Sequence, residues 1–146
     1  MPLFDPEKMV RLASEMRKSL ARLTALGKMD VSDFVADPDR IGSAKYHFIV
    51  AIEICIDMCN HVISRNGYRV PEDYADTFEV MSEAGAIEES FAEELKNMAR
   101  FRNRLVHLYW EVDDRQVHHF LQTRLADFKC FLDALAVFLN WSDEPT

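Results

Sequence analysis

The chain has 146 residues, of which 49% are hydrophobic and 29% are charged, and its formal net charge is −8. This length fits one domain spanning residues 1–146, and the apolar fraction is enough for a buried core, which excludes an intrinsically disordered chain. Four Gly and five Pro are too few for an all-β fold with many turns. The acidic charge excludes a surface that grips nucleic acid everywhere, so any contact with nucleic acid must be local. No contact with DNA is expected.

No segment is expected to carry the chain into or across a membrane. Glu53 and Asp57 interrupt the longest apolar run, which falls short of the roughly 18 residues of a membrane span. The first residues contain acidic side chains and no apolar signal region. Three Cys, an odd number, indicate reduced thiols. We therefore expect a cytoplasmic protein.

Pro, Gly and capping residues divide the chain into pieces whose apolar residues recur at helical spacing. No alternating strand pair and no hairpin turn between β-branched runs is evident. We predict an all-α, up-down helical bundle with four main helices and a shorter one. In chain order, the expected helical segments run from Asp5-Pro6 to Gly27, over residues 31–35, from about Arg40 to Ser64, from Val70-Pro71 to near Gly85, from about Ile87 to His107, and after Asp114 to about Trp141.

Arg102 departs from the pattern of the helix expected at residues 87–107. At about 100° per residue, it lies at the centre of the face that should enter the core. Arg100 and Arg104 fall on the opposite side and are expected to face solvent. A charge on a core-facing position is costly unless it has a partner. The apolar residues within about 60° of Arg102 are Phe91, Leu95, Met98, Ala99, Leu105 and Val106.

Two interpretations of Arg102 are open. In the structural one, it forms an ion pair with Glu53 or Asp57, which share a polar line with His61 at spacings of four residues. In the functional one, this face is partly a cleft or a dimer interface, where Arg102 meets an anionic ligand.

The residues that follow Arg102 favour phosphate chemistry. An arginine offers a planar fork of donors to a phosphate, and a histidine exchanges protons near neutral pH. Asn103, His107 and Tyr109 add an amide, an imidazole and a phenol at the end of the same helix. On a straight helix Arg102 and His107 point about 140° apart. They converge only if the helix turns near His107 or if a second copy contributes across a two-fold axis.

The segment Arg102-Asn-Arg-Leu-Val-His107-Leu-Tyr109 resembles the R-x4-H-x-Y signature of HepT-type proteins of the HEPN superfamily, the toxin halves of HepT–MntA toxin–antitoxin modules. The resemblance covers most of residues 40–140. Leu108 stands where many relatives carry an acidic residue, which leaves the charge at the cleft open. The other segments that carry the resemblance are residues 51–61, 70–78 and 110–117.

The resemblance implies a helical homodimer, joined through the motif helix, that cleaves RNA at the dimer cleft as a metal-independent endoribonuclease without a cofactor. It implies that Arg102 and His107 are catalytic and that Asn103 supports them. It also implies a partner, an MntA-like nucleotidyltransferase antitoxin that silences the toxin by adding AMP to Tyr109.

Two other functions remain as alternatives. One is a non-catalytic HEPN module that binds the nucleotidyltransferase or dimerises, with Arg102 and Tyr109 as a docking and modification site. The other is a plain helical interaction protein whose Arg102 is paired internally. Residues 95–124 hold six Lys or Arg against three Asp or Glu, a basic strip that is compatible with a local RNA contact.

No metal site is expected. Cys55 and Cys59 share a helix face, but with Cys130 they are too few for a four-cysteine site. The acidic line with His61 lacks the Glu-x-x-His spacing of di-iron bundles. The adjacent pair His118-His119 diverges by about 100° on a helix.

Overall fold

The computed structural model describes residues 1–142, and within that range every regular element is helical. This confirms the all-helical fold predicted from the sequence. The elements, in chain order, are α1 (Pro6–Leu26), α2 (Val31–Val35), α3 (Pro38–Asn66), α4 (Tyr74–Glu83), α5 (Glu89–His107), the 3-10 turn η1 (Tyr109–Glu111), α6 (Asp114–Thr123) and α7 (Ala126–Leu139).

Capping residues fix the ends of the helices close to where the sequence predicts them. Asp5, Asp37 and Asp73 each precede a helix and accept hydrogen bonds from backbone N–H groups of its first turn. The long helix α3 ends at Gly67, whose φ of 65° lies in the left-handed region that glycine adopts without strain. Its N–H donates to the carbonyl of Ile63, which closes the last turn of α3.

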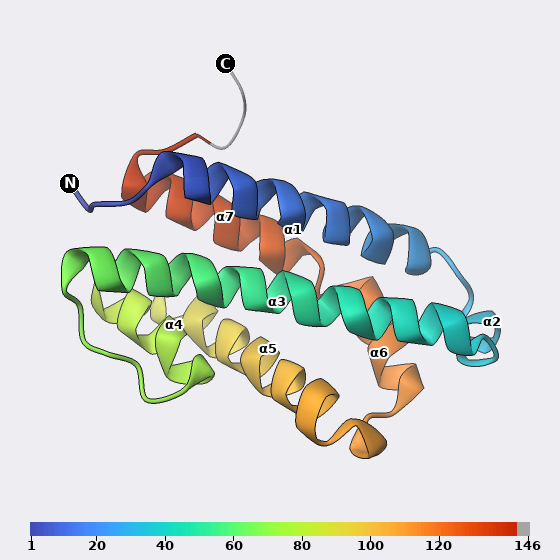
Figure 1. Ribbon diagram of the computed structural model, residues 1–146. Helices are drawn as coiled ribbons and strands as arrows, with labels where there is room; N and C mark the ends of the chain where they lie inside the picture. The colour runs from blue at the N-terminus through green and yellow to red at the C-terminus, as the bar shows by residue number, and fades with distance from the viewer. Residues whose placement is uncertain (143–146) are drawn as a thin grey trace.

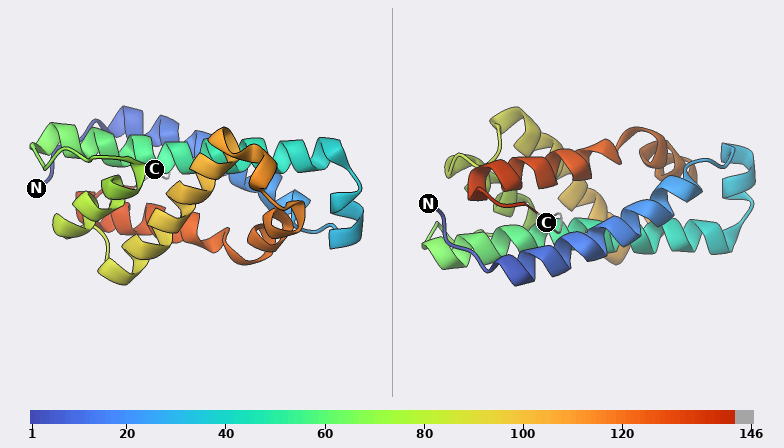
Figure 2. Two further views of the ribbon diagram at one scale, coloured as in Figure 1. Left: turned by 90° about the horizontal axis from the view of Figure 1, so that it is seen from below. Right: turned by 90° about the horizontal axis from the view of Figure 1, so that it is seen from above.

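The helices pack in two layers. Helices α1 and α3 run antiparallel and form one layer, and α4, α5 and α7 form the layer that faces it (Figures 1 and 2). Helices α2 and α6 close one end of the bundle, and α4 lies against α5 near the other end. The C-terminal end of α5 and the turn η1 therefore protrude from the bundle next to α6 (Figure 1).

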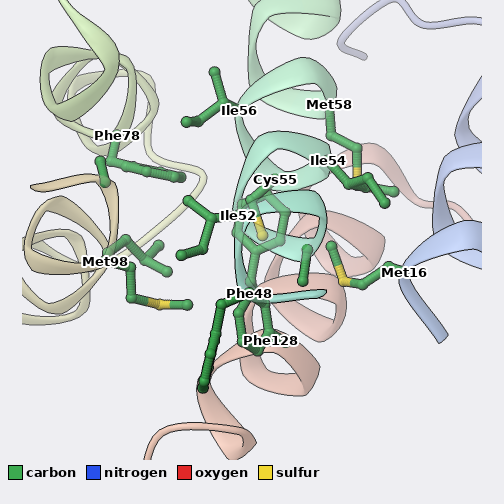
Figure 3. Close-up of a cluster of buried hydrophobic side chains, with 14 of the residues drawn as sticks. Met16, Phe48, Ile52, Ile54, Cys55, Ile56, Met58, Phe78, Met98 and Phe128 are labelled. Atoms are coloured by element: carbon green, nitrogen blue, oxygen red, sulfur yellow. The ribbon is translucent and has the colours of Figure 1, made fainter. Parts of the chain in front are cut away.

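The core is built on α3, which contributes side chains to both layers. Figure 3 shows Phe48, Ile52 and Ile56 of α3 directed between the helices, with Phe78 of α4 and Met98 of α5 beside them. Phe48, Ile52, Ile56 and Phe78 are at most 2% exposed, and burying each such side chain contributes about 1.5–3 kcal/mol. This packing holds α5 against α3 and so fixes the position of Arg102.

The prediction of one continuous helix after Asp114 is wrong, because the structure divides this segment into α6 and α7 at Arg124. The two parts pack on different neighbours. In α6, His118 hydrogen-bonds the carbonyl of Met29, and Gln122 donates to the carbonyl of Gly27. In contrast, α7 packs along the core through residues such as Phe128. One straight helix would satisfy only one of these contacts, and the apolar spacing alone does not reveal the break.

Helix α3 is long and apolar enough to span a bilayer by length and composition alone. In the structure, 61% of its apolar window is buried inside the fold. This burial is what the central helix of a packed bundle shows.

Candidate functional site

Arg102 lies on the face of α5 that packs against α3, and Glu53 of α3 is its partner. The Nε atom donates to Glu53 Oε1 at 3.0 Å, and Nη2 donates to the same oxygen at 2.5 Å. The side chain of Arg102 is 12% exposed, whereas that of Glu53 is 41% exposed. The structural interpretation of Arg102 is therefore correct in that it has an internal carboxylate partner, and that partner is Glu53.

Two further groups orient the guanidinium. Nη1 of Arg102 donates to Asn103 Oδ1 at 3.1 Å. The guanidinium carbon lies 4.9 Å from the centre of the Tyr74 ring, a cation–π contact with the first residue of α4. The sequence reasoning missed Tyr74, because the contact joins helices that only the fold brings together.

The ion pair does not use all of the donors of Arg102. A guanidinium has five N–H groups, and the bonds to Glu53 and Asn103 use three of them. The two that remain, one on each terminal nitrogen, donate to no described residue and are free for another acceptor. Arg102 is held in place and is still able to bind an anion.

Arg102 lines an open surface depression with a volume of about 600 Å³. Asn103 and His107, both predicted for the site from the sequence, line the same depression. The structure thus brings the arginine and the histidine of the motif to one surface within a single chain. The remaining lining residues are Asp73, Tyr74, Arg104 and Leu108.

The end of α5 lies at the depression. His107 is the last residue of the helix, and Leu108 leaves helical geometry with φ −131° and ψ 39°. The imidazole of His107 is exposed and makes no hydrogen bond to the residues that the structure describes. Arg102 and His107 therefore both keep helical backbone, and the chain changes direction only from Leu108 onward.

Arg104 corrects a second expectation. The sequence places it on the solvent side of α5, opposite Arg102, but it is half-buried and lines the depression. Its Nη2 donates to Gln116 Oε1 of α6 at 3.4 Å, so packing against α6 draws the side chain inward. Arg104 adds a second guanidinium to the surface that holds Arg102, against the single carboxylate of Asp73. The lining residues carry one net positive charge, and the carboxylate of Glu53, which pairs with Arg102, lies beside them.

Tyr109 and Trp110 form the exposed turn η1 directly after the helix. Tyr109 is 62% exposed and Trp110 is 67% exposed. The hydroxyl-bearing ring of Tyr109 is therefore accessible to a modifying enzyme, as the sequence-based hypothesis requires.

Asp57 and His61 do not take part in the site. Asp57 lines a different depression, with Lys8 of α1. Burial and the nearby charge of Glu53 raise the pKa of Asp57. His61 accepts a hydrogen bond on Nε2 from the backbone N–H of Asp5, and burial with nearby cations lowers its pKa. Of the polar line on α3, only Glu53 reaches Arg102, whereas Asp57 and His61 both line the second depression.

The described residues contain no group of three or more His, Cys, Asp and Glu side chains that could hold a metal ion. Cys55 and Cys59 are buried, and burial raises the pKa of both thiols. Cys130 is exposed on α7, away from them. His118 uses its Nε2 in the bond to the Met29 carbonyl and has a structural role.

Comparison with known proteins assigns the family. The family model described as HepT-like ribonuclease matches residues 16–135, which include α3, α5 and every residue of the depression. The chain belongs to the HepT-like family. The resemblance found in the motif is thereby confirmed across most of the fold.

Relatives of this HepT-like chain include two named ribonucleases. An mRNA nuclease HepT of Shewanella oneidensis is 32% identical over 83 residues, which cover 57% of this chain and 62% of the relative. A putative RNase of Archaeoglobus fulgidus is 33% identical over 88 residues, which cover 60% of this chain and 66% of the relative. The chain thus aligns with slightly less than two thirds of each of these proteins.

A solved structure gives a longer match. The tri-AMPylated Shewanella oneidensis HEPN toxin, in complex with MNT antitoxin, superposes with a TM-score of 0.82 and 26% sequence identity. The superposition covers 88% of this chain and 96% of that toxin. The bundle of this HepT-like chain is therefore the fold of a HEPN toxin.

Proposed function

We propose that this HepT-like chain is the toxin of a toxin–antitoxin pair and that it cleaves RNA at the depression lined by Arg102 and His107. The observation that carries the proposal is the placement of an oriented guanidinium with free donors and an exposed imidazole on one surface. The two relatives of this chain that are named as ribonucleases, and its fold, which is that of a HEPN toxin, support the proposal.

The proposed reaction uses the RNA's own 2′-hydroxyl as the nucleophile. Its oxygen attacks the adjacent phosphorus, the bond to the 5′-oxygen of the next nucleotide breaks, and a 2′,3′-cyclic phosphate and a 5′-hydroxyl result. His107 takes the proton from the 2′-hydroxyl or supplies one to the leaving oxygen. The free N–H groups of Arg102 stabilise the charge that develops on the phosphate. Neither step requires a bound metal ion, so we propose metal-independent cleavage.

We further propose that two copies associate through α5. A second copy brings a second His107 to the groove, so that one imidazole acts as base and the other as acid. Light scattering of the purified chain should give twice the monomer mass. A strictly monomeric chain that still cleaves RNA would contradict this part of the proposal.

We propose that a nucleotidyltransferase antitoxin silences the toxin by adding AMP to Tyr109. The phenolic oxygen would attack the α-phosphorus of ATP, and pyrophosphate would leave. The modification places bulk and negative charge beside Arg102 and Arg104, where it competes with RNA for the cations. The exposure of Tyr109 and the AMPylated toxin of the same fold support this. Mass analysis after co-expression with such an enzyme should show added AMP on the wild-type chain and none on the Tyr109→Phe variant.

The decisive experiment for cleavage compares two histidines. Synthetic RNA is incubated with EDTA-treated wild-type chain, with His107→Ala and with His119→Ala, which removes an exposed histidine of α6 outside the depression. We expect the wild type and His119→Ala to release cyclic-phosphate products. We expect His107→Ala to lose about 10²–10⁴-fold in rate. Equal cleavage by all three would refute the proposal.

One observation favours a second function, a non-catalytic module that binds the nucleotidyltransferase. Glu53 occupies two donors of Arg102, as a purely structural arginine would show. The same experiments separate the functions. A wild-type chain that acquires AMP on Tyr109 but never cleaves RNA would favour the non-catalytic module. A chain that does neither would favour a plain helical interaction protein.

A further inference from the structure

Trp110 is unusual in presenting its ring to solvent. It is 67% exposed, whereas Trp141 is partly buried against the core. Its neighbour Tyr109 is 62% exposed and meets it edge-on, with ring centres 5.3 Å apart at 82°. Burying a large aromatic ring against another surface is favourable, and no described residue covers this exposed pair, so it offers a platform for a ligand.

The turn that carries Trp110 is held in place by the backbone. The N–H of Leu108 donates to the Arg104 carbonyl at 2.9 Å, and the N–H of Glu111 donates to the Leu108 carbonyl at 2.9 Å. Val112, directly after the turn, is 9% exposed and anchors it to the core. The ring of Trp110 is therefore displayed on an ordered turn and does not swing on a long loop.

The turn borders the depression that holds Arg102 and Arg104. Leu108 and His107 both line the depression, and Trp110 follows His107 by three residues. Three residues span at most about 11 Å, so the indole lies within the reach of a nucleotide beside a phosphate held at His107. Proteins bind single-stranded nucleic acid by combining cationic side chains, which contact the phosphate backbone, with aromatic rings, which stack on the bases.

We propose that Trp110 stacks on the base of a nucleotide next to the phosphate that is cleaved, and that the chain thereby selects unpaired RNA. The inference rests on the proposed ribonuclease function and names a base-binding residue for it. Selection for unpaired RNA follows because a base within a duplex already stacks on both faces and offers no face to the indole.

The test measures binding separately from cleavage. A labelled single-stranded RNA with 2′-O-methyl groups has no nucleophile and cannot be cleaved by the proposed reaction. Its dissociation constant is measured by fluorescence anisotropy for the wild type, Trp110→Ala, Trp110→Phe and Val137→Ala. Val137 is the matched control, because it is 84% exposed but lies on α7.

We expect Trp110→Ala to weaken binding by about 5- to 100-fold, the loss typical of one base–aromatic stack. Trp110→Phe should retain most of the affinity, and Val137→Ala should bind as the wild type does. A duplex of the same sequence should bind wild type and Trp110→Ala equally.

Equal binding of the single strand by wild type and Trp110→Ala would overturn the inference. It would equally be overturned if Trp110→Ala left RNA binding intact but altered the mass of the chain in light scattering, because the turn would then contact protein. Failure of the proposed function is a different result, since wild type would not cleave the unmethylated strand.

Discussion

Arg69 and Arg102 both bind carboxylates, and the comparison between them separates a structural role from a functional one. Arg69, in the connection after α3, donates four hydrogen bonds of 2.7–3.1 Å to Asp76 and Glu83. Arg102 donates to one carboxylate oxygen, of Glu53, and to the amide oxygen of Asn103.

The more exposed of the two arginines is the more completely neutralised. The side chain of Arg69 is 43% exposed and faces two carboxylates, whereas that of Arg102 is 12% exposed and faces one. Arg102 keeps donors free and lines a depression with His107 and a second guanidinium. Arg69 uses four of its donors on two carboxylates, whereas the donors that Arg102 keeps free beside an open surface are available to an anionic ligand.

The largest expected effect is a difference in the rate of RNA cleavage between variants of Arg102 and Arg69. Replacing Arg102 by Ala should lower the rate of RNA cleavage by about 10²–10³-fold, because it removes charge stabilisation on the phosphate. Replacing Arg69 by Ala should leave that rate unchanged. Arg102→Lys, which keeps the charge and loses the fork, should fall between wild type and Arg102→Ala. Initial rates on one RNA measure all three, with circular dichroism to confirm that each variant is folded.

If Arg69→Ala and Arg102→Ala lost activity equally, both arginines would act only through the fold. The functional distinction between the two clusters would then be wrong.

A smaller effect compares neighbouring carboxylates on α3. Glu53→Gln should lower the free energy of unfolding by about 1 kcal/mol, since Glu53 bonds a charged group but is itself partly exposed. Asp57→Asn should raise it by about 0.5 kcal/mol or less at pH 7, because partial burial and the charge of Glu53 raise the pKa of Asp57, while the exposure of Asp57 to solvent keeps the effect small. Urea denaturation gives both values.

The sign of the Asp57 effect follows from that raised pKa. The folded state favours the protonated acid. The stability that protonated Asp57 contributes is therefore fully present below the pKa of the unfolded chain, near 4, and is lost as the pH rises through the pKa of the folded state. The gain from Asp57→Asn should therefore disappear at about pH 3. A gain that persists unchanged there would show another cause.

Another small effect concerns the Arg69 cluster. The hydrogen bonds from Arg69 and from the backbone of Glu72 lower the pKa of Asp76 to about 2. A lowered pKa stabilises the fold above the unfolded value near 4, and this stability is lost as the pH falls toward 2. Asp76→Asn should cost about 0.5–1 kcal/mol at pH 7, as for exposed ion pairs, and nothing near pH 2. A cost that is independent of pH would assign the effect to packing.

The sequence predicts the helices and the motif residues well because both depend on local information. Asp and Gly caps mark helix ends, and the position of Arg102 follows from the angle per residue. The break between α6 and α7 was missed because it depends on contacts with the α1–α2 connection, nearly a hundred residues away in the chain.

The composition of the site was predictable only in part, for the same physical reason. Arg102, Asn103 and His107 come from one helix, and they line one surface. Tyr74 and the inward turn of Arg104 depend on packing between helices. Spacing within α3 makes Glu53 and Asp57 equivalent candidates, and only the placement of α5 selects Glu53.

The central claim is that Arg102 and His107 act together on one phosphate. Its most direct test is the rate of RNA cleavage by wild type, Arg102→Ala, His107→Ala and the double variant. Residues that act as a unit are strongly non-additive. We therefore expect each single variant to lose most of the activity and the double variant to be no slower than the slower single one. Single variants as fast as wild type, or losses that multiply in the double variant, would contradict the claim.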